Sequence, residues 1–356
     1  MKNPSDEENI ISSSKASSSW RNHISISRIG LVFVGSLVAV SCFLSYKSAY
    51  HFQFLPTSFR SSSSPAPVSP EKLDVELEKV LRAASMEDNK TVILTTLNDA
   101  WAKPGSVIDV FLESFRIGNN TNGLLTHLVI VTLDEKAHSR CLAIHPHCYA
   151  LVTRGLNFTQ EAFFMTPTYL EMMWARIEFL ATVLEMGYSF IFTDADVMWL
   201  QNPFPHFYPV ADFQIACDNY WGNSSDRNNM PNGGFNYVKS NTPTIQFYKF
   251  WYFSRTQYPG KHDQDVLNMI KFDPFIDKIG LQMRFLDTAY FGGFCEPSKN
   301  FNLVCTMHAN CCFGLEHKVY DLKLVLEDWR RFMLSPPNVK ASSSFSWRAP
   351  DKCRLR

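Results

Sequence analysis

The stretch Phe190-Ile-Phe-Thr-Asp194-Ala-Asp196-Val-Met-Trp-Leu200 carries two carboxylates, one residue apart, directly after a run of strand-forming residues. Side chains two residues apart on an extended backbone point to the same side, so both carboxylates can reach one hard divalent cation. Mg²⁺ and Mn²⁺ prefer carboxylate oxygens and keep coordination positions open for substrate phosphates. The stretch therefore predicts the cation half of a nucleotide-diphosphate site.

A long amphipathic helix is predicted immediately before this strand. Pro167 and Thr168-Tyr-Leu-Glu171 fit a helix start with a capping box, and Gly187 fits its stop. Apolar residues at helical spacing form its buried stripe: Met173, Ile177, Leu180 and Leu184. Ligands of open α/β sheets bind at the carboxyl ends of strands, which favours a functional Asp pair; a solvated turn is the alternative for the motif taken alone.

Strand-like and helix-like segments alternate earlier in the chain. Residues 91–97 and 128–133 are rich in strand formers, and helical patterns cover residues 106–117 and 135–144. This alternation predicts βαβ units around a mostly parallel sheet, an α/β fold. The 356 residues are 46% hydrophobic and 19% charged, which suits one large domain with appendages. Because the formal net charge is zero, nucleic acid is not an expected partner.

The N-terminal part predicts a single-pass membrane anchor. Residues 29–46 form an uncharged, mostly apolar run that is just long enough to cross a thin bilayer as a helix. Lys15, Arg21 and Arg28 precede it, which favours a cytosolic N-terminus and a luminal bulk; a cleaved signal peptide is the alternative. The expected division is a cytosolic tail over 1–28, the anchor over 29–46, a Ser/Pro-rich stem over 47–88, the globular domain over 89–335 and a C-terminal tail over 336–356.

Sequons and cysteines agree with a luminal placement. Four N-x-S/T sequons follow the apolar run, at Asn89, Asn119, Asn157 and Asn223. Of nine cysteines, Cys42 lies inside the run. The other eight are even in number and would be oxidisable in a secretory lumen, although the sequence does not give their pairing.

Several fingerprints of other enzyme classes are missing. The chain has no G-x-G-x-x-G after its first strand, no P-loop and no G-x-S-x-G, which weakens the dinucleotide oxidoreductase, phosphotransferase and hydrolase interpretations. Cys305-Thr-Met-His308-Ala-Asn-Cys311-Cys312 and His145-Pro-His147-Cys148 superficially resemble zinc ligand sets. In an oxidising lumen we expect disulfides at both places, which leaves His308 available as a nitrogen ligand for the cation held by the Asp pair.

Other polar and aromatic features have two interpretations each. Arg176, on the helix before the Asp pair, is either a surface charge or a group that orients the carboxylates. His262-Asp-Gln-Asp265 opens a helix, where polar groups are as often caps as catalysts. The aromatic helix over 244–258 is expected to be mainly core rather than a platform for an acceptor. The Asn-rich loop over 219–232 is a second candidate to shape an acceptor groove.

The ordered set of motifs resembles a known family. Thr95-Thr96-Leu97, Arg176, Phe192-Thr-Asp194-Ala-Asp196, Asn232-Gly-Gly234-Phe, Asp263-Gln264-Asp265 and His308 occur in the order typical of plant Golgi nucleotide-diphospho-sugar transferases. The similarity is to the retaining family that includes rhamnogalacturonan-II xylosyltransferases and extensin arabinosyltransferases. It spans roughly residues 90–332, nearly all of the globular part.

This resemblance implies a GT-A fold, a Rossmann-like mixed α/β sheet flanked by helices, with a cation at a strand end. It implies that Asp194, Asp196 and His308 bind Mn²⁺ or Mg²⁺. It assigns donor contacts to the following residues: Thr95, Thr96, Arg176, Asp194, Asn232, Gly234 and Lys318. The ten-residue spacing from His308 to Lys318 departs from the tighter His-x-x-Gly-x-x-Lys spacing of related families. Asp263 and Gln264 are implied beside the anomeric carbon.

The function expected from these observations is transfer of a sugar from a nucleoside-diphosphate donor, with UDP as the expected nucleotide, to a cell-wall polysaccharide or glycoprotein. A type II Golgi membrane protein with a luminal catalytic domain is the expected setting, and a transferase complex is a possible assembly. Two alternatives stay open: a catalytically silent sugar-binding or scaffold partner, and a hydrolase of nucleotide sugars with water as acceptor.

Overall fold

The computed structural model describes residues 70–87, 89–151, 165–341 and 345–353. The predicted cytosolic tail and membrane anchor lie outside the described residues, as does sequon Asn157. The described helices are α2 (Pro70–Ala84), α3 (Asp99–Ala102), α4 (Val107–Ile117), α5 (Glu135–Ile144), α6 (Pro167–Glu185), α7 (Thr242–Ser254), α8 (Asp263–Ile270), α9 (Pro274–Lys278), α10 (Leu315–Leu334) and α11 (Pro337–Ala341), with 3-10 turns η1 (Asn122–His127) and η2 (Phe204–His206). None of these helices is long and apolar enough to span a bilayer.

Two sheets organise the chain. The larger contains β1 (Thr91–Leu97), β2 (Leu128–Thr132), β3 (Cys148–Ala150), β4 (Ser189–Thr193), β6 (Phe213–Asn219), β7 (Met230–Val238) and β8 (Met283–Phe285), in the order β3-β2-β1-β4-β7-β6-β8. The smaller contains β5 (Val197–Trp199), β9 (Phe291–Gly293) and β10 (Thr306–His308), in the order β5-β10-β9.

The larger sheet is mixed. Strands β3, β2, β1 and β4 are mutually parallel neighbours, as the alternation of segments predicts. β7 pairs antiparallel with both β4 and β6, and β8 is parallel to β6. The prediction of an α/β fold with a mixed sheet is therefore confirmed, and β7 is the strand that runs antiparallel to both of its neighbours.

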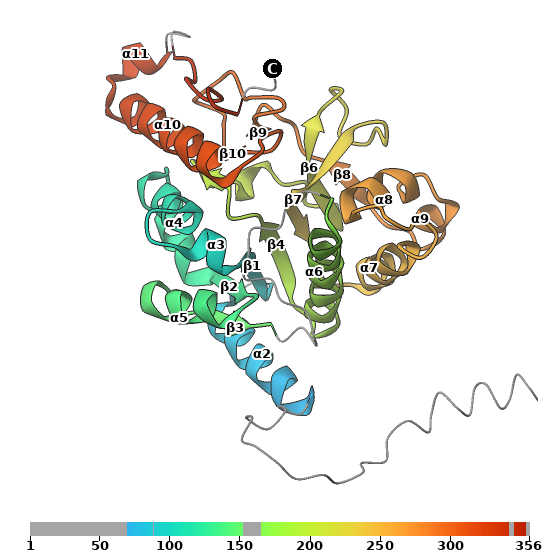
Figure 1. Ribbon diagram of the computed structural model, residues 1–356. Helices are drawn as coiled ribbons and strands as arrows, with labels where there is room; N and C mark the ends of the chain where they lie inside the picture. The colour runs from blue at the N-terminus through green and yellow to red at the C-terminus, as the bar shows by residue number, and fades with distance from the viewer. Residues whose placement is uncertain (1–69, 88, 152–164, 342–344, 354–356) are drawn as a thin grey trace, which may run out of the picture. The chain divides into compact units, whose positions relative to one another are not determined.

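The core lies on both faces of the larger sheet, with α4 and α10 on one side and α6 and α7 on the other (Figure 1). Strand β4 shows the reason, because side chains alternate between the two faces of a sheet. Phe190 and Phe192 pack with α6 and α7, whereas Ile191 joins the core on the side of α4 and α10. A strand that is buried on both faces carries a nearly continuous apolar run and no charged side chain, so the first charged residues mark its end.

The helix before the Asp pair forms as predicted, with one correction at its start. Thr166, not Thr168, is the N-cap, and its hydroxyl accepts a hydrogen bond from the Tyr169 N–H. Pro167 occupies the first helical turn, where its missing N–H has no helical partner to lose. Gly187 follows the helix with a φ of +85°, as its predicted stop requires.

The aromatic helix α7 is mainly core, as expected. Phe247, Tyr248 and Trp251 are buried among the residues of the larger sheet and α6, whereas Phe253 is 63% exposed. The Trp251 indole also donates a hydrogen bond to the carbonyl of Asp263 (2.8 Å), which connects α7 to the start of α8.

Two segments expected to be appendages belong in part to the folded unit. Helix α2 falls within the predicted stem, yet it buries Leu77, Leu81 and Ala84. At the other end, the ring of Trp347 stacks on Phe301. The Ser/Pro tract of the predicted stem ends where α2 begins, and short polar residues dominate the second segment.

Three disulfides form within the described chain: Cys141–Cys148, Cys295–Cys311 and Cys312–Cys353. They confirm the disulfide interpretation of the His145-Pro-His147-Cys148 segment and of Cys311 and Cys312. Cys217 and Cys305 are buried free thiols, so the expectation that Cys305 is oxidised is wrong. The sequons at Asn89, Asn119 and Asn223 are exposed, and their glycosylation stays a prediction.

Packing of α2 predicts that it contributes to stability. Leu81→Ala should lower the free energy of unfolding of a 68–356 fragment by about 2 to 5 kcal/mol, because it opens a cavity in the core. Val75→Ala on the same helix is the matched control, since Val75 is 66% exposed. Urea unfolding followed by circular dichroism measures both, and equal midpoints for the two variants would contradict the packing of α2.

Candidate functional site

Asp194 and Asp196 lie in the turn that joins β4 of the larger sheet to β5 of the smaller one. Contrary to our expectation from the sequence, the Asp pair is therefore not extended. It lies in a turn, and this turn still brings the two carboxylates together. Backbone hydrogen bonds hold this turn from both sides: the Asp194 N–H donates to the Gly234 carbonyl (2.7 Å), and the Ala309 N–H donates to the Asp196 carbonyl (3.0 Å).

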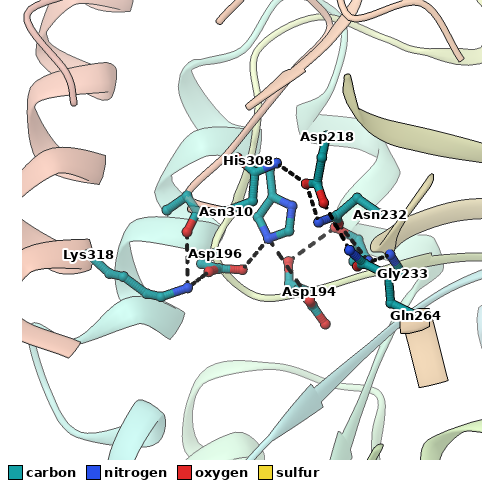
Figure 2. Close-up of polar contacts among 12 residues, drawn as sticks. Asp194, Asp196, Asp218, Asn232, Gly233, Gln264, His308, Asn310 and Lys318 are labelled. Carbon is teal, nitrogen blue, oxygen red and sulfur yellow. Dashed lines mark hydrogen bonds and ion pairs between the residues drawn. The ribbon is translucent and has the colours of Figure 1, made fainter. Parts of the chain in front are cut away.

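His308, the last residue of β10, completes a cluster of three ligand-type side chains. One ligand atom each from Asp194, Asp196 and His308 lies within 4.8 Å of the other two. The imidazole Nε2 of His308 is 3.1 Å from Asp196 Oδ1 and 4.0 Å from Asp194 Oδ2 (Figure 2). The β10–β5 pairing aligns His308 with Val197, directly after the Asp pair, so the sheet register sets this approach.

The cluster fits a divalent cation by two observations. Asp196 Oδ1 is buried and forms no hydrogen bond, although His308 Nε2 is 3.1 Å away, so a shared cation would satisfy both ligand atoms. A Cβ on Gly234 would lie 2.5 Å from His308 Cε1 and 2.6 Å from Asp194 Oδ2. Glycine at position 234 is therefore required for these two side chains to occupy their positions. Two carboxylates and one imidazole suit Mn²⁺ or Mg²⁺ with positions left for further oxygen ligands.

Lys318, near the start of α10, places a positive charge beside the cluster of Asp194, Asp196 and His308. Its ammonium lies 2.5 Å from Asp196 Oδ2 and donates to the Ala309 carbonyl (3.0 Å). Burial alone would raise the pKa of Asp196, but Lys318 and His308 together more than offset it and hold this pKa well below its usual range. Asp196 is therefore an ionised carboxylate inside the protein.

Arg176, on α6, is a buried group and not a surface charge. Its guanidinium binds Asp194 (3.0 Å) and Asp263 (2.5 Å), and it lies 4.8 Å from the centroid of the Phe192 ring. Burial works against its charge, but the two carboxylates raise its pKa above the ordinary value. Burial raises the pKa of Asp194 in spite of Arg176, whereas at Asp263 Arg176 and His262 together more than offset burial and lower the pKa.

Asp263 and Gln264 start α8, and His262 caps this helix by accepting from the Gln264 N–H. Asp263 is only 1% exposed and is committed to Arg176, so it positions the guanidinium. The side chain of Gln264 accepts a hydrogen bond from the Gly233 N–H (3.0 Å). Both predicted catalytic residues thus lie at the site, in different environments.

All these groups surround one cleft of about 430 Å³. The following sequence-predicted residues line it: Thr96, Arg176, Asp194, Asp196, Asn232, Gly234, Asp263, Gln264, His308 and Lys318. Thr95 does not line the cleft, because successive residues of β1 point to opposite faces of the sheet. The side chain of Thr95 is fully buried. Of the two predicted threonines, only Thr96 has access to a ligand in this cleft.

Further cleft residues escaped the sequence analysis. Asp218 stands near the end of β6, Asn310 follows His308 by two residues, and Tyr169 belongs to the first turn of α6. The rule that ligands meet the carboxyl ends of strands could have identified Asp218, since the strand-forming run over residues 213–217 directly precedes it. Nothing in the sequence alone distinguishes Asn310 or Tyr169 from other polar residues in loops and caps.

Comparison with known proteins defines the family. A family profile described as nucleotide-diphospho-sugar transferase matches residues 123–322, more than half of the chain, and includes the Asp pair, Arg176 and His308. The chain belongs to this family. It is a glycosyltransferase.

Similar curated proteins come from Arabidopsis thaliana. The uncharacterized protein At4g15970 is 53% identical over 78% of this chain and 73% of its own length, and At1g28695 is 40% identical over 75% and 82%, respectively. Arabinosyltransferase RRA1 is 23% identical over 46% of this transferase and 37% of its own length. The family expected from the motifs is thus confirmed.

Solved structures with a related arrangement include glycosyltransferases. Mouse xyloside xylosyltransferase 1 has 14% identity and a TM-score of 0.38, covering 62% of this chain and 98% of its own. GlyE of Streptococcus pneumoniae has 14% identity and a TM-score of 0.40, covering 70% of this chain and 61% of its own.

The contacts of Gly234 generate a prediction about cation binding. Gly234→Ala should lower the affinity for Mn²⁺ at least about tenfold, because the added methyl group displaces His308 and Asp194. Gly233→Ala is the matched control, since the nearest atoms to its Cβ are 3.5 Å away, at ordinary contact distance. Mn²⁺ titration followed by electron paramagnetic resonance measures both. Equal losses in the two variants would show that the cluster is not the cation site.

Proposed function

We propose that this protein is a metal-dependent glycosyltransferase of GT-A type that moves a sugar from a UDP donor to a cell-wall polysaccharide or glycoprotein with retention of configuration. One observation carries the proposal: Asp194, Asp196 and His308 gather beside Lys318 and Arg176 in a cleft that is large enough for a small-molecule ligand. This arrangement supplies positive charge at the place where the diphosphate would separate from the sugar.

The chemistry follows from the charge that develops on the leaving group. Breaking the bond between the sugar and the diphosphate leaves additional negative charge on the phosphate oxygens. The ammonium of Lys318 stands within the cluster and stabilises that charge more in the transition state than in the ground state. Asp194, Asp196 and His308 would hold Mn²⁺, and the bound cation supplies further positive charge for the diphosphate.

Arg176 and Asp263 serve this reaction by positioning. Because Asp263 is buried and ion-paired, it fixes the guanidinium, which in turn orients Asp194. Gln264 presents a neutral amide to the cleft and is the group we assign beside the anomeric carbon. A neutral amide is a poor nucleophile, which favours same-face attack guarded by the departing phosphate over a covalent intermediate at this residue.

The donor and the setting complete the proposal. The similarity to a protein named as an arabinosyltransferase supports a pentose as one donor to test first. We assign the protein to the Golgi membrane as a single-pass type II protein, from the apolar run over residues 29–46 and its flanking charges. Disulfides formed by six cysteines agree with an oxidising lumen.

A donor panel tests the proposed reaction. The 68–356 fragment with Mn²⁺ should release UDP from one UDP-sugar, and Asp196→Ala should abolish the release because it removes a cation ligand. Glu185→Ala is the control, since this exposed side chain lies at the end of α6 remote from its Arg176 turn. A luminescence assay for UDP measures all three proteins, with circular dichroism as the test of folding.

The outcomes of the panel separate three functions. UDP release that grows when a wall acceptor is added, together with a new glycoside, establishes the transferase. Release that yields only free sugar under all conditions indicates a hydrolase. A folded protein that turns over no donor would sink the catalytic proposal and leave the silent sugar-binding partner.

Lys318 generates a separate prediction about the chemical step. Lys318→Met should lower kcat by about 100-fold or more, by analogy with loss of one group that stabilises transition-state charge, and should change donor KM much less. Lys323→Met on the exposed face of the same helix is the control. Steady-state kinetics on the donor found in the panel measure both. A change in KM alone would place Lys318 in binding and not in leaving-group stabilisation.

A further inference from the structure

Asp218 is held by three amide side chains at the edge of the cleft. Its Oδ1 accepts hydrogen bonds from Asn232 Nδ2 and Asn310 Nδ2, both at 2.8 Å, and its Oδ2 accepts one from Gln264 Nε2 at 2.9 Å (Figure 2). A carboxylate has about four acceptor positions on its two oxygens. Three are used here by neighbouring side chains, and the remaining one belongs to Oδ2 of a residue that lines the cleft.

Backbone groups fix the orientation of each of these amides. Their side-chain oxygens accept from main-chain N–H groups: Asn232 from Gly234 (2.9 Å), Gln264 from Gly233 (3.0 Å) and Asn310 from Cys295 (3.1 Å). Each amide therefore has its oxygen toward the backbone and its NH₂ group toward Asp218. The carboxylate of Asp218 is fixed by this arrangement, because no amide can be flipped without losing two hydrogen bonds.

A disulfide holds one side of this arrangement. Cys311, next to Asn310, is bonded to Cys295, whose own N–H donates to the Asn310 side chain. The Cys295 sulfur lies 3.4 Å from Asp218 Oδ1, and as part of a disulfide it has no hydrogen to donate, so this is a packing contact. Gly293 leaves the space for the Asn310 amide, since a Cβ there would lie 2.4 Å from Asn310 Oδ1.

We propose that Asp218 is a sugar-recognition residue, whose Oδ2 accepts a hydrogen bond from a ring hydroxyl of a sugar bound in the cleft. A fixed acceptor beside Asn232 and Gln264 has the wrong charge for phosphate and the right chemistry for a hydroxyl. It lies outside the cation cluster, so it acts on the sugar rather than on the diphosphate. The inference rests on the proposed glycosyl transfer, and either the donor sugar or the acceptor sugar can supply the hydroxyl.

The test compares Asp218→Asn with wild type in the presence of Mn²⁺. Calorimetry gives Kd for UDP and for the UDP-sugar that wild type turns over. If the hydroxyl belongs to the donor, the affinity for UDP stays unchanged while that for the UDP-sugar falls about 10- to 100-fold, as expected for a lost charge-assisted hydrogen bond. If it belongs to the acceptor, both affinities and donor hydrolysis stay unchanged, and transfer to methyl glycosides of arabinose, xylose and galactose falls by a similar factor.

Two further variants keep the test decisive. Glu296→Gln is the control, because this nearby carboxylate accepts from the Tyr220 N–H and does not line the cleft. Asn310→Ala removes one of the three donors and should produce a smaller loss in the same parameter, so it replaces Asp218→Asn if that variant does not fold. Equal losses for UDP and UDP-sugar, or no change in any parameter, would overturn the assignment. A wild-type protein that binds no UDP would overturn the proposed function itself.

Discussion

The buried guanidinium of Arg176 is the interaction on which the site depends. It joins three elements that are far apart in the chain: its own helix α6, the turn after β4 through Asp194, and the start of α8 through Asp263. Burying charges is costly unless each is paired at good geometry, and removing one partner of a buried pair costs several kcal/mol. The pairing therefore specifies one arrangement of these elements, and the wall of the cleft follows from it.

The opposite wall is built from the C-terminal third of the chain. His308 arrives on β10 and Lys318 on α10, and both meet Asp196. The disulfide between Cys312 and Cys353 connects the segment before α10 to the end of the described chain. The Asp321 carboxylate, one turn after Lys318, accepts hydrogen bonds from three N–H groups of residues 351–353. Residues that the sequence presents as a tail thus hold the helix that carries Lys318.

The sequence predicted the parts of the site that obey local rules. The Asp pair follows an apolar strand, and such a strand must end where charge begins, so its place at a strand end could be inferred. The burial of Arg176 could not, because its two partners are 18 and 87 residues away. The role of Asp218 could not be inferred for the same reason, because each of its three hydrogen-bond donors comes from a different segment. Long-range hydrogen bonds decide these roles, and periodicity carries no information about them.

The charges at the centre of the cleft explain why both a cation and an anion suit it. Asp194, Asp196 and Asp263 contribute three carboxylates, whereas Arg176 and Lys318 contribute two positive charges. Arg176 is only 6% exposed and is bound to two carboxylates, which hold it in place. Lys318 is 18% exposed and shares Asp196 with His308. Added positive charge at the Asp pair would weaken the hold of Asp196 on Lys318, and the ammonium, on a flexible stem at the cleft, is then the group best able to turn toward a diphosphate.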